Sequence, residues 1–205
     1  YLLLRQGDIQ IRRVAGMWEE IIQYDKQLFL FLNSLGTGPW DGFWLFITNK
    51  WSSIPLYAVL LILSYRSFGP KKTIVLLVAV ALMITVTDQL ANFFKYGIQR
   101  LRPCHDPDIN LLMRLVKKSC GGRFGYFSAH AANATATAFF FTILFRTIHA
   151  HIGIFLMFWA FFVAYSRIYI GVHFPLDVVT GVGIGLILSW LFAKLYIFAL
   201  QKIPL

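Results

Sequence analysis

The segment TIVLLVAVALMITVTDQLANFF, residues 73–94, decides the fold class, because it is apolar along nearly its whole length. A helix needs about 20 consecutive apolar residues to cross the hydrocarbon core of a bilayer. Other apolar runs approach or exceed this length at residues 43–65, 129–148, 152–170 and 175–200. The first of these runs has one interruption. We therefore predict an all-α, polytopic membrane helical bundle with five transmembrane helices, or six if residues 27–48 also cross.

The composition sets this chain apart from soluble globular domains. Of its 205 residues, 58% are hydrophobic and 14% are charged, whereas soluble domains average about 45–50% apolar and about 25% charged residues. The net charge is +10, but the basic residues lie between the apolar segments rather than in a tail. This placement favours anionic lipid headgroups or phosphate in the membrane bilayer as partners, and not nucleic acid.

The N-terminal region differs from the spans that follow it. Between Trp18 and Leu32, apolar side chains alternate with charged ones, a pattern typical of a helix that lies in the membrane interface. Residues 1–16 fit neither a membrane span nor a cleavable signal peptide. They are either a native, flexible extension or a segment foreign to the native chain, and the sequence leaves both open. We assign the membrane domain to residues 17–205.

Three polar clusters fall on the same side of the predicted bundle. Alternation of the spans places on one face the end of the second span, the start of the third, the end of the fourth and the start of the fifth. The clusters at these ends are KYGIQRLRP (95–103), YFSAH (126–130) and SRIYIGVHFPLD (166–177). Convergence from four spans is not expected of isolated surface residues, so the sequence predicts a functional site at this face.

The third cluster carries a histidine and a carboxylate at the start of a helix. Pro175 suits the first helical position, where its missing amide hydrogen leaves no donor unsatisfied. His173 would then lie just outside the helix and Asp177 in its first turn, where the helix dipole favours a negative charge. Asp177 could hold one imidazole nitrogen and leave the other free to attack, as the acid does in catalytic triads. The alternative for His173 alone is an interfacial hydrogen bond.

The second cluster combines a helix cap with a second histidine. Ser128 suits the N-cap position, and the amides at a helix N-terminus, beginning with that of Ala129, form a site for anions. His130 could donate a proton to a leaving oxygen. A plain serine cap is the alternative, and it is compatible with the functional interpretation.

The first cluster adds positive charge. Lys95 and Arg102, together with Arg167 of the third cluster, place three cations at the same face, and arginine binds phosphate oxygens with paired donors. For each residue taken singly, a snorkelling anchor is the alternative. Asp88 shares a helix face with Lys95, so we expect it either to orient a cation of the site or to make a structural polar contact.

Two further features have open interpretations. Cys104 and Cys120 lie in the one long connection, residues 103–127, and form either a disulfide on an oxidising side of the membrane or two free thiols. Gly181 and Gly185 form a GxxxG pattern that favours close helix packing, either within the bundle or in a homodimer.

Together, the patterns K-x6-RP, SxH and SR-x5-H-x3-D across residues 95–177 resemble the signatures of the type 2 phosphatidic acid phosphatase (PAP2) superfamily of membrane lipid phosphatases. The resemblance implies a phosphohistidine mechanism that needs no metal and no other cofactor. It implies that His173 is the nucleophile, Asp177 its orienting partner and His130 the general acid. The phosphate ligands that it implies are Lys95, Arg102, Ser128, the amide of Ala129 and Arg167.

The sequence departs from the family's usual P-S-G-H in two places, with Phe127 in place of the proline and Ala129 in place of the glycine. Alanine would be penalised if this position required a positive φ. It is well suited to the first helical position, where its amide still points at the phosphate. We expect the second case, which leaves the site intact.

The resemblance also implies a lipid phosphate substrate. The short chain is similar to bacterial members that act on undecaprenyl pyrophosphate, phosphatidylglycerol phosphate or lipid A. Additional cations on the site face indicate either a second phosphate or anionic headgroup, or only a solvated basic loop. They are Arg100, Arg114, Lys117, Lys118 and Arg123. This excess charge favours undecaprenyl pyrophosphate, with the other two lipids as alternatives.

A non-enzymatic lipid-phosphate transporter or binding protein is the alternative from another class. It would use the same cations but would not need His130, His173 and Asp177 together.

The family places its site face in the periplasm or outside the cell, which implies a multi-pass protein of the bacterial inner membrane. By the positive-inside rule alone the orientation stays open, because both faces carry basic residues. Those opposite the site are Arg66, Lys71, Lys72, Arg146, Lys194 and Lys202.

Overall fold

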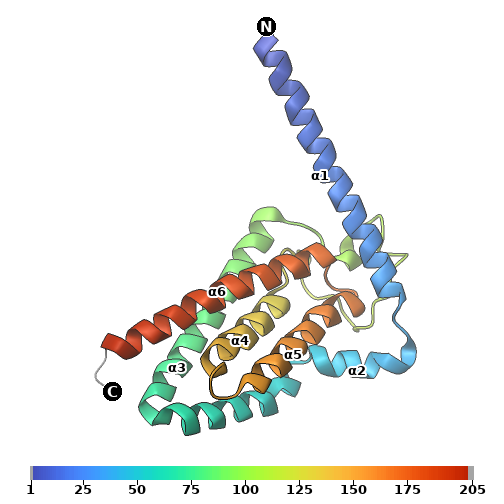
Figure 1. The fold of residues 1–205 in the computed structure, drawn as a ribbon. Coiled ribbons are helices and arrows are strands. Elements are labelled where there is room, and N and C mark those ends of the chain that lie inside the picture. Colours follow the sequence, from blue (N-terminus) through green and yellow to red (C-terminus); the bar gives the residue numbers. More distant parts are fainter. Residues whose placement is uncertain (1, 203–205) are drawn as a thin grey trace.

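The computed structural model describes residues 2–202, with side chains from residue 16 onward. Within these residues the chain forms six α-helices (Figure 1). They are α1 (Leu2–Ser34), α2 (Gly38–Thr48), α3 (Ile54–Ile98), α4 (Ala129–Phe145), α5 (Ala150–Tyr169) and α6 (Pro175–Lys202). Two short 3-10 helices, η1 (Lys50–Ser53) and η2 (Pro103–His105), lie in the connections. The predicted all-α bundle is confirmed.

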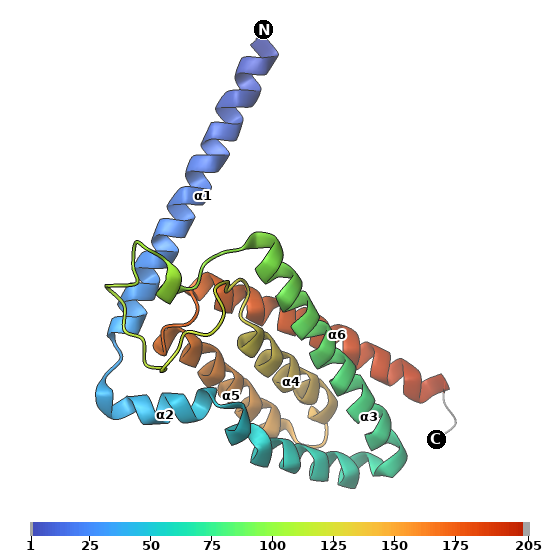
Figure 2. The same cartoon turned by 180° about the vertical axis from the view of Figure 1, so that it is seen from behind.

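Three stretches of the described chain are long and apolar enough to cross a membrane, namely Lys50–Ile98, α5 and α6, while α4 is apolar but shorter. Two predicted spans meet in α3, which is bent at Gly69 (φ +77°) and Pro70. Proline cannot donate the helical hydrogen bond, and glycine adopts a positive φ without steric cost. The two arms of α3 run in different directions (Figure 2). The predicted first span, 43–65, is therefore divided between α2 and the first arm of α3.

Residues 27–48 do not form a sixth span. A turn at residues 35–37 separates α1 from α2, and α2 has 11 residues, too few to cross a bilayer. The amphipathic segment 18–32 is helical, as predicted, and belongs to α1.

The helix α4 packs between α5 and α6 (Figure 1). A Cβ atom on Gly181 would lie 2.6 Å from the carbonyl oxygen of Ser128, and one on Gly185 would lie 2.5 Å from that of Ala132. Of the two interpretations of the GxxxG pattern, the structure therefore supports packing within the bundle. This close contact sets the start of α4 against the start of α6.

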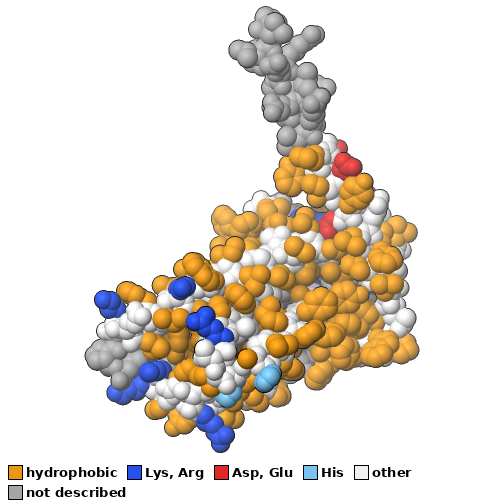
Figure 3. Space-filling view, viewed as in Figure 1, with side chains coloured by type: hydrophobic (Ala, Val, Ile, Leu, Met, Phe, Trp, Pro, Cys, Tyr) orange, Lys and Arg blue, Asp and Glu red, His pale blue; other side chains and the backbone are white. Residues whose placement is uncertain are grey.

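The outer surface of the bundle is predominantly hydrophobic (Figure 3), as expected where lipid tails surround a protein. Basic side chains gather at the end of the bundle where α6 finishes and α3 bends (Figure 3). The polar clusters meet at the other end. The apolar helices and this surface are those of an integral membrane protein.

Candidate active site

A cavity of about 500 Å³ lies where α3 and α5 end and α4 and α6 begin. Two of the residues predicted for the site, Ser128 and Asp177, are fully buried beside it. Six others line its wall: Lys95, Arg102, Ala129, His130, Arg167 and His173. The structure therefore brings together, at one end of the bundle, the three clusters that the sequence placed on one face.

His173 and Asp177 form a buried pair at the start of α6. Their side chains are 3% and 0% exposed, and His173 Nδ1 lies 3.5 Å from Asp177 Oδ2. The same oxygen accepts the Phe174 N–H at 3.1 Å, which is the return contact of a capping box. The Asp177 carbonyl accepts the Ser128 N–H at 3.0 Å. Asp177 thus links His173 to the starts of both α4 and α6.

Burial is the main reason that the pKa of His173 falls to about 4. Arg167 and Arg102 lower this pKa as well, while the Asp177 carboxylate opposes them. The imidazole is therefore neutral at pH 7, which is the form that can attack an electrophile.

Arg100 supports the Asp177 carboxylate. Its Nη1 donates to Asp177 Oδ1 at 2.7 Å, and its Nη2 donates to Asp25 of α1. The guanidinium also lies over the Phe174 ring, 4.3 Å from the centroid. Arg100 was one of the cations considered either for a second phosphate or for a solvated basic loop, and in the structure its charge is paired with two carboxylates.

The other additional cations have different surroundings. Arg114 pairs with Asp41 of α2, so it too is engaged. Lys117 lines the cavity, as a phosphate ligand would. Lys118 and Arg123 are exposed and do not line it, which agrees with the interpretation of a solvated basic loop for these two.

The start of α4 is as predicted. Ser128 is the N-cap, and its Oγ accepts the Ala131 N–H at 3.4 Å. Ala129 is the first helical residue, and Gln99 is the only described non-glycine residue with a positive φ. The Ala129 amide is thus one of the donors that a helix N-terminus leaves for an anion. His130, one position on, lines the cavity.

Different parts of the chain position the two arginines of the cavity wall. Arg102 donates to the carbonyl oxygens of Phe124 at 3.2 Å and Cys120 at 2.8 Å. Arg167 is 4% exposed and donates from Nη1 to Thr48 Oγ1. Its Nε is buried and has no partner among the described residues. An unpaired donor on a buried cation is costly, so this group is suited to an anionic ligand.

Asp88 lines the cavity, and its Oδ1 accepts a hydrogen bond of 2.9 Å from Asn133 Nδ2 of α4. No ion pair joins it to Lys95 in the described part of the chain. Of the two roles left open by the sequence, the geometry favours the structural polar contact between α3 and α4.

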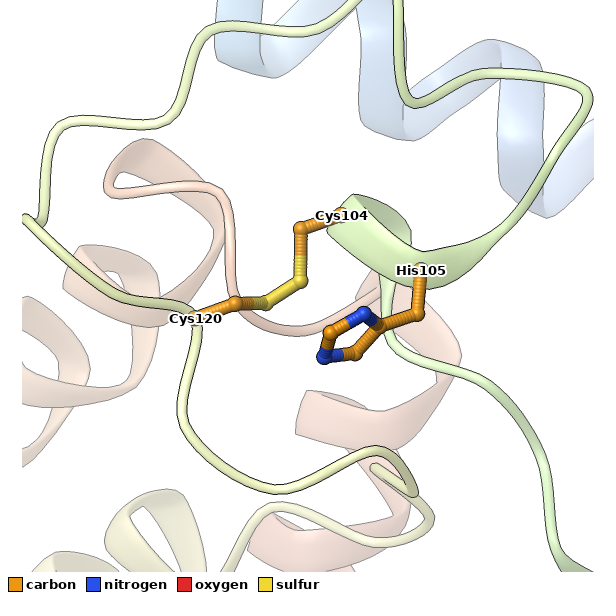
Figure 4. Close-up of side chains that lie close together, drawn as sticks. All are labelled: Cys104, His105 and Cys120. Carbon is orange, nitrogen blue, oxygen red and sulfur yellow. A yellow bond between two sulfur atoms is a disulfide. The ribbon is translucent and has the colours of Figure 1, made fainter.

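The connection between α3 and α4 contains a disulfide between Cys104 and Cys120 (Figure 4). This outcome favours the first of the two interpretations. His105 lies beside the two sulfurs (Figure 4), but sulfurs joined in a disulfide are not the thiolates that bind metals. The disulfide instead anchors Cys120, whose carbonyl holds Arg102.

Three residues that shape the site were missed in the sequence. Asp25 pairs with Arg100 across 75 positions of the chain, and no local pattern could show this. Lys50 of η1 lines the cavity, although its sequence context is that of an interfacial anchor. A Cβ on Gly125 would lie 3.0 Å from Arg102 Cγ and 3.4 Å from Asp177 Oδ2, so the backbone passes the site too closely for a side chain.

Comparison with known proteins identifies relatives of this chain. A lipid A 4'-phosphatase of Bacteroides thetaiotaomicron is 39% identical over 178 residues, covering 86% of this chain and 78% of that protein. A lipid A 4'-phosphatase of Porphyromonas gingivalis is 34% identical over 191 residues, covering 90% and 78%. An undecaprenyl-diphosphatase of Sulfolobus acidocaldarius is 28% identical over 186 residues, covering 89% and 81%.

Among solved structures, the crystal structure of Aquifex aeolicus LpxE is similar, with a TM-score of 0.58 and 30% identity. The match covers 82% of this chain and 93% of that chain. The family model of the PAP2 superfamily matches residues 72–200, which include all three sequence patterns and every cavity residue predicted from them. The chain therefore belongs to the PAP2 superfamily, and it is a membrane lipid phosphatase of this metal-independent family.

Proposed function

We propose that this protein removes a phosphate group from a sugar of lipid A through a phosphohistidine intermediate at His173. The observation that carries the proposal is the position of a neutral His173, buried against Asp177 in the wall of a cavity that also presents His130. A transporter or binding protein would need the cations of this cavity but not this arrangement of three residues.

The choice of lipid rests on the relatives. The two lipid A 4'-phosphatases are 39% and 34% identical to this chain, against 28% for the undecaprenyl-diphosphatase. Undecaprenyl pyrophosphate, favoured from the sequence, is therefore less well supported than the lipid A alternative. The charge argument for it is also weaker, because Arg100 and Arg114 are held by carboxylates.

In the first step, the phosphoryl group of the lipid occupies the cavity. Lys95, Arg102, Arg167 and the N-terminus of α4 neutralise its equatorial oxygens, which is the main source of catalysis in phosphoryl transfer. Nδ1 of His173 faces Asp177, so Nε2 attacks phosphorus. The N–P bond forms as the bond from phosphorus to the sugar oxygen breaks, and His130 donates a proton to that oxygen.

In the second step, water hydrolyses the phosphohistidine. His130, now without its proton, accepts one from the attacking water. The new O–P bond forms as the N–P bond breaks, and the electron pair returns to Nε2 of His173. Inorganic phosphate leaves, and both histidines are back in their starting states.

The membrane orientation belongs to the same proposal. We place the cavity on the periplasmic or exterior side, because Cys120 of its wall forms a disulfide with Cys104, and disulfides persist on oxidising sides of a membrane. An impermeant maleimide should label the two cysteines in intact cells only after reduction. Labelling that requires cell lysis would place the cavity in the cytoplasm.

A substrate panel tests the proposed function. Phosphate release by the purified protein is measured with lipid A, phosphatidylglycerol phosphate and undecaprenyl pyrophosphate. We expect the highest kcat/KM on lipid A, and a loss of at least about a thousandfold in His173→Ala. His151→Ala is the matched control, because this exposed histidine lies outside the cavity at the start of α5. Equal rates on all three lipids would contradict the assignment to lipid A.

A further inference from the structure

A second cavity of about 430 Å³ adjoins the first. It is lined by Leu45, Thr48, Asn49, Lys50, Lys117 and His130, and all of these except Leu45 also line the first cavity. The two cavities are therefore one continuous space. His173 lines only the first part, whereas His130 lines both.

The charge of this space is larger than one phosphate group needs. Its charged wall residues are five cations, Lys50, Lys95, Arg102, Lys117 and Arg167, and one carboxylate, Asp88. None of the five forms an ion pair with a described residue. A phosphate monoester carries about −1.5 to −2 at neutral pH, so one such group leaves roughly two positive charges without a counter-charge.

Two of these five cations, Lys50 and Lys117, line both cavities. Burial, followed by repulsion from Arg167 and Arg102, lowers the pKa of Lys117, as expected of a lysine facing like charges. Lys117 is also on the disulfide-closed loop, three residues before Cys120. Lys50 begins η1, and its Nζ lies 5.1 Å from the centre of the Trp51 ring.

We propose that Lys50 and Lys117 bind a second phosphoryl group of the lipid substrate, on the leaving-group side of the reaction centre. This inference rests on the proposed function, in which His173 attacks phosphorus and His130 protonates the leaving oxygen. His130, which protonates the leaving oxygen, lines both parts of the space, whereas His173 lines only the first, so we place the leaving group in the second part. Asn49 and Thr48 are the polar side chains that complete the subsite.

The second phosphoryl group could reach this subsite from two kinds of substrate. In a bis-phosphorylated lipid A it belongs to the other sugar of the leaving group. In a polyprenyl diphosphate it is bonded through oxygen to the reacting phosphorus. Both carry an anion on the leaving-group side of the reacting phosphorus, so the subsite selects doubly phosphorylated substrates over singly phosphorylated ones.

Matched substrate pairs test the subsite. Values of kcat/KM are measured for bis-phosphorylated lipid A against lipid A with the 4'-phosphate alone, and for undecaprenyl pyrophosphate against undecaprenyl phosphate. We expect the wild-type protein to prefer the doubly phosphorylated member of at least one pair. In Lys50→Gln/Lys117→Gln that preference should fall by about tenfold or more, because charge-assisted hydrogen bonds to the second phosphate are lost.

The control variant is Lys118→Gln, which removes the same charge from the same loop but from a residue that lines neither cavity. It should leave the preference unchanged. A preference that stays the same in the double variant, or that falls as far in the control, would overturn the subsite. If the wild-type protein hydrolyses undecaprenyl pyrophosphate but not lipid A, the proposed lipid is wrong. The subsite is then tested by the kcat/KM ratio of undecaprenyl pyrophosphate to undecaprenyl phosphate in the wild-type and double-variant proteins.

Discussion

The reactivity of His173 is set by the groups around it. A free imidazole has a pKa of about 6.5, and burial with two arginines nearby brings that of His173 to about 4. Asp177 does not reverse this shift, because one of its oxygens is bound to Arg100 and the other is shared with the Phe174 N–H. A neutral nucleophile at physiological pH is the result.

The protonation state of His173 can be measured directly. Without substrate, we expect the imidazole to stay neutral as the pH falls through 6.5 and to gain its proton only near pH 4, because the folded-state pKa is depressed. The measurement is a pH titration by NMR of histidine-labelled protein in detergent, with His173→Gln to assign the signal. Protonation of His173 at pH 6 or above would contradict the burial argument.

The same shift has a consequence for stability. In the unfolded chain His173 binds a proton below pH 6.5, whereas in the folded protein it does so only near pH 4. The unfolded state therefore binds more protons between these values, and the free energy of unfolding falls as the pH drops through that window.

Arg100 should matter for folding more than for binding. Arg100→Met leaves the buried Asp177 and Asp25 without their counter-charge, which typically costs about 3–5 kcal/mol. We expect a large drop in the thermal unfolding temperature in detergent. Arg123→Met, which removes an exposed arginine from the same connection, should change it little. Similar unfolding temperatures for the two variants would show that the ion pairs contribute nothing.

At the scale of elements, the site depends on how closely α4 and α6 pack. One helix supplies the Ser128 cap and the other supplies Asp177, and the hydrogen bond from the Ser128 amide to the Asp177 carbonyl joins them. Gly181 and Gly185 allow the two backbones to approach. A displacement of either helix would therefore separate His130 from His173.

Three glycines of α6 provide a matched test of this contact. Gly181→Ala and Gly185→Ala place a Cβ at 2.6 and 2.5 Å from backbone oxygens of α4, and overpacking of this kind costs about 1–3 kcal/mol. We expect both variants to lose stability and phosphatase activity.

Gly183→Ala is the control, because a Cβ there meets nothing within 4 Å. It should be neutral or stabilising by up to about 1 kcal/mol through helix propensity. Equal effects of all three alanines on thermal unfolding and kcat/KM would show that the α4–α6 contact does not set the site.

The start points of the helices were predictable because their signals are local. Ser128 before Ala129 and Pro175 before Asp177 each carry capping information within a few residues. The bend at Gly69 and Pro70 has a local signal too. The interruption within residues 43–65 was visible in the sequence and coincides with η1, but the assignment of its two parts to separate helices, α2 and α3, was not predicted.

At the scale of the whole molecule, alternation of apolar segments was enough to bring three distant clusters to one end of the bundle. It could not show which charges of that end are already paired. Arg100 with Asp25 and Arg114 with Asp41 are contacts between segments more than 70 positions apart. The prediction of undecaprenyl pyrophosphate as substrate counted these arginines among the cations available to bind it.

The site of covalent attachment tests the central claim most directly. The purified protein is mixed briefly with lipid A, quenched at alkaline pH where phosphohistidine survives, digested and analysed by mass spectrometry. The mechanism predicts a phosphate on His173 in the wild-type protein and on no peptide in His173→Ala. Continued release of phosphate by His173→Ala at a near-normal rate, or a phosphate found on His130 instead, would contradict it.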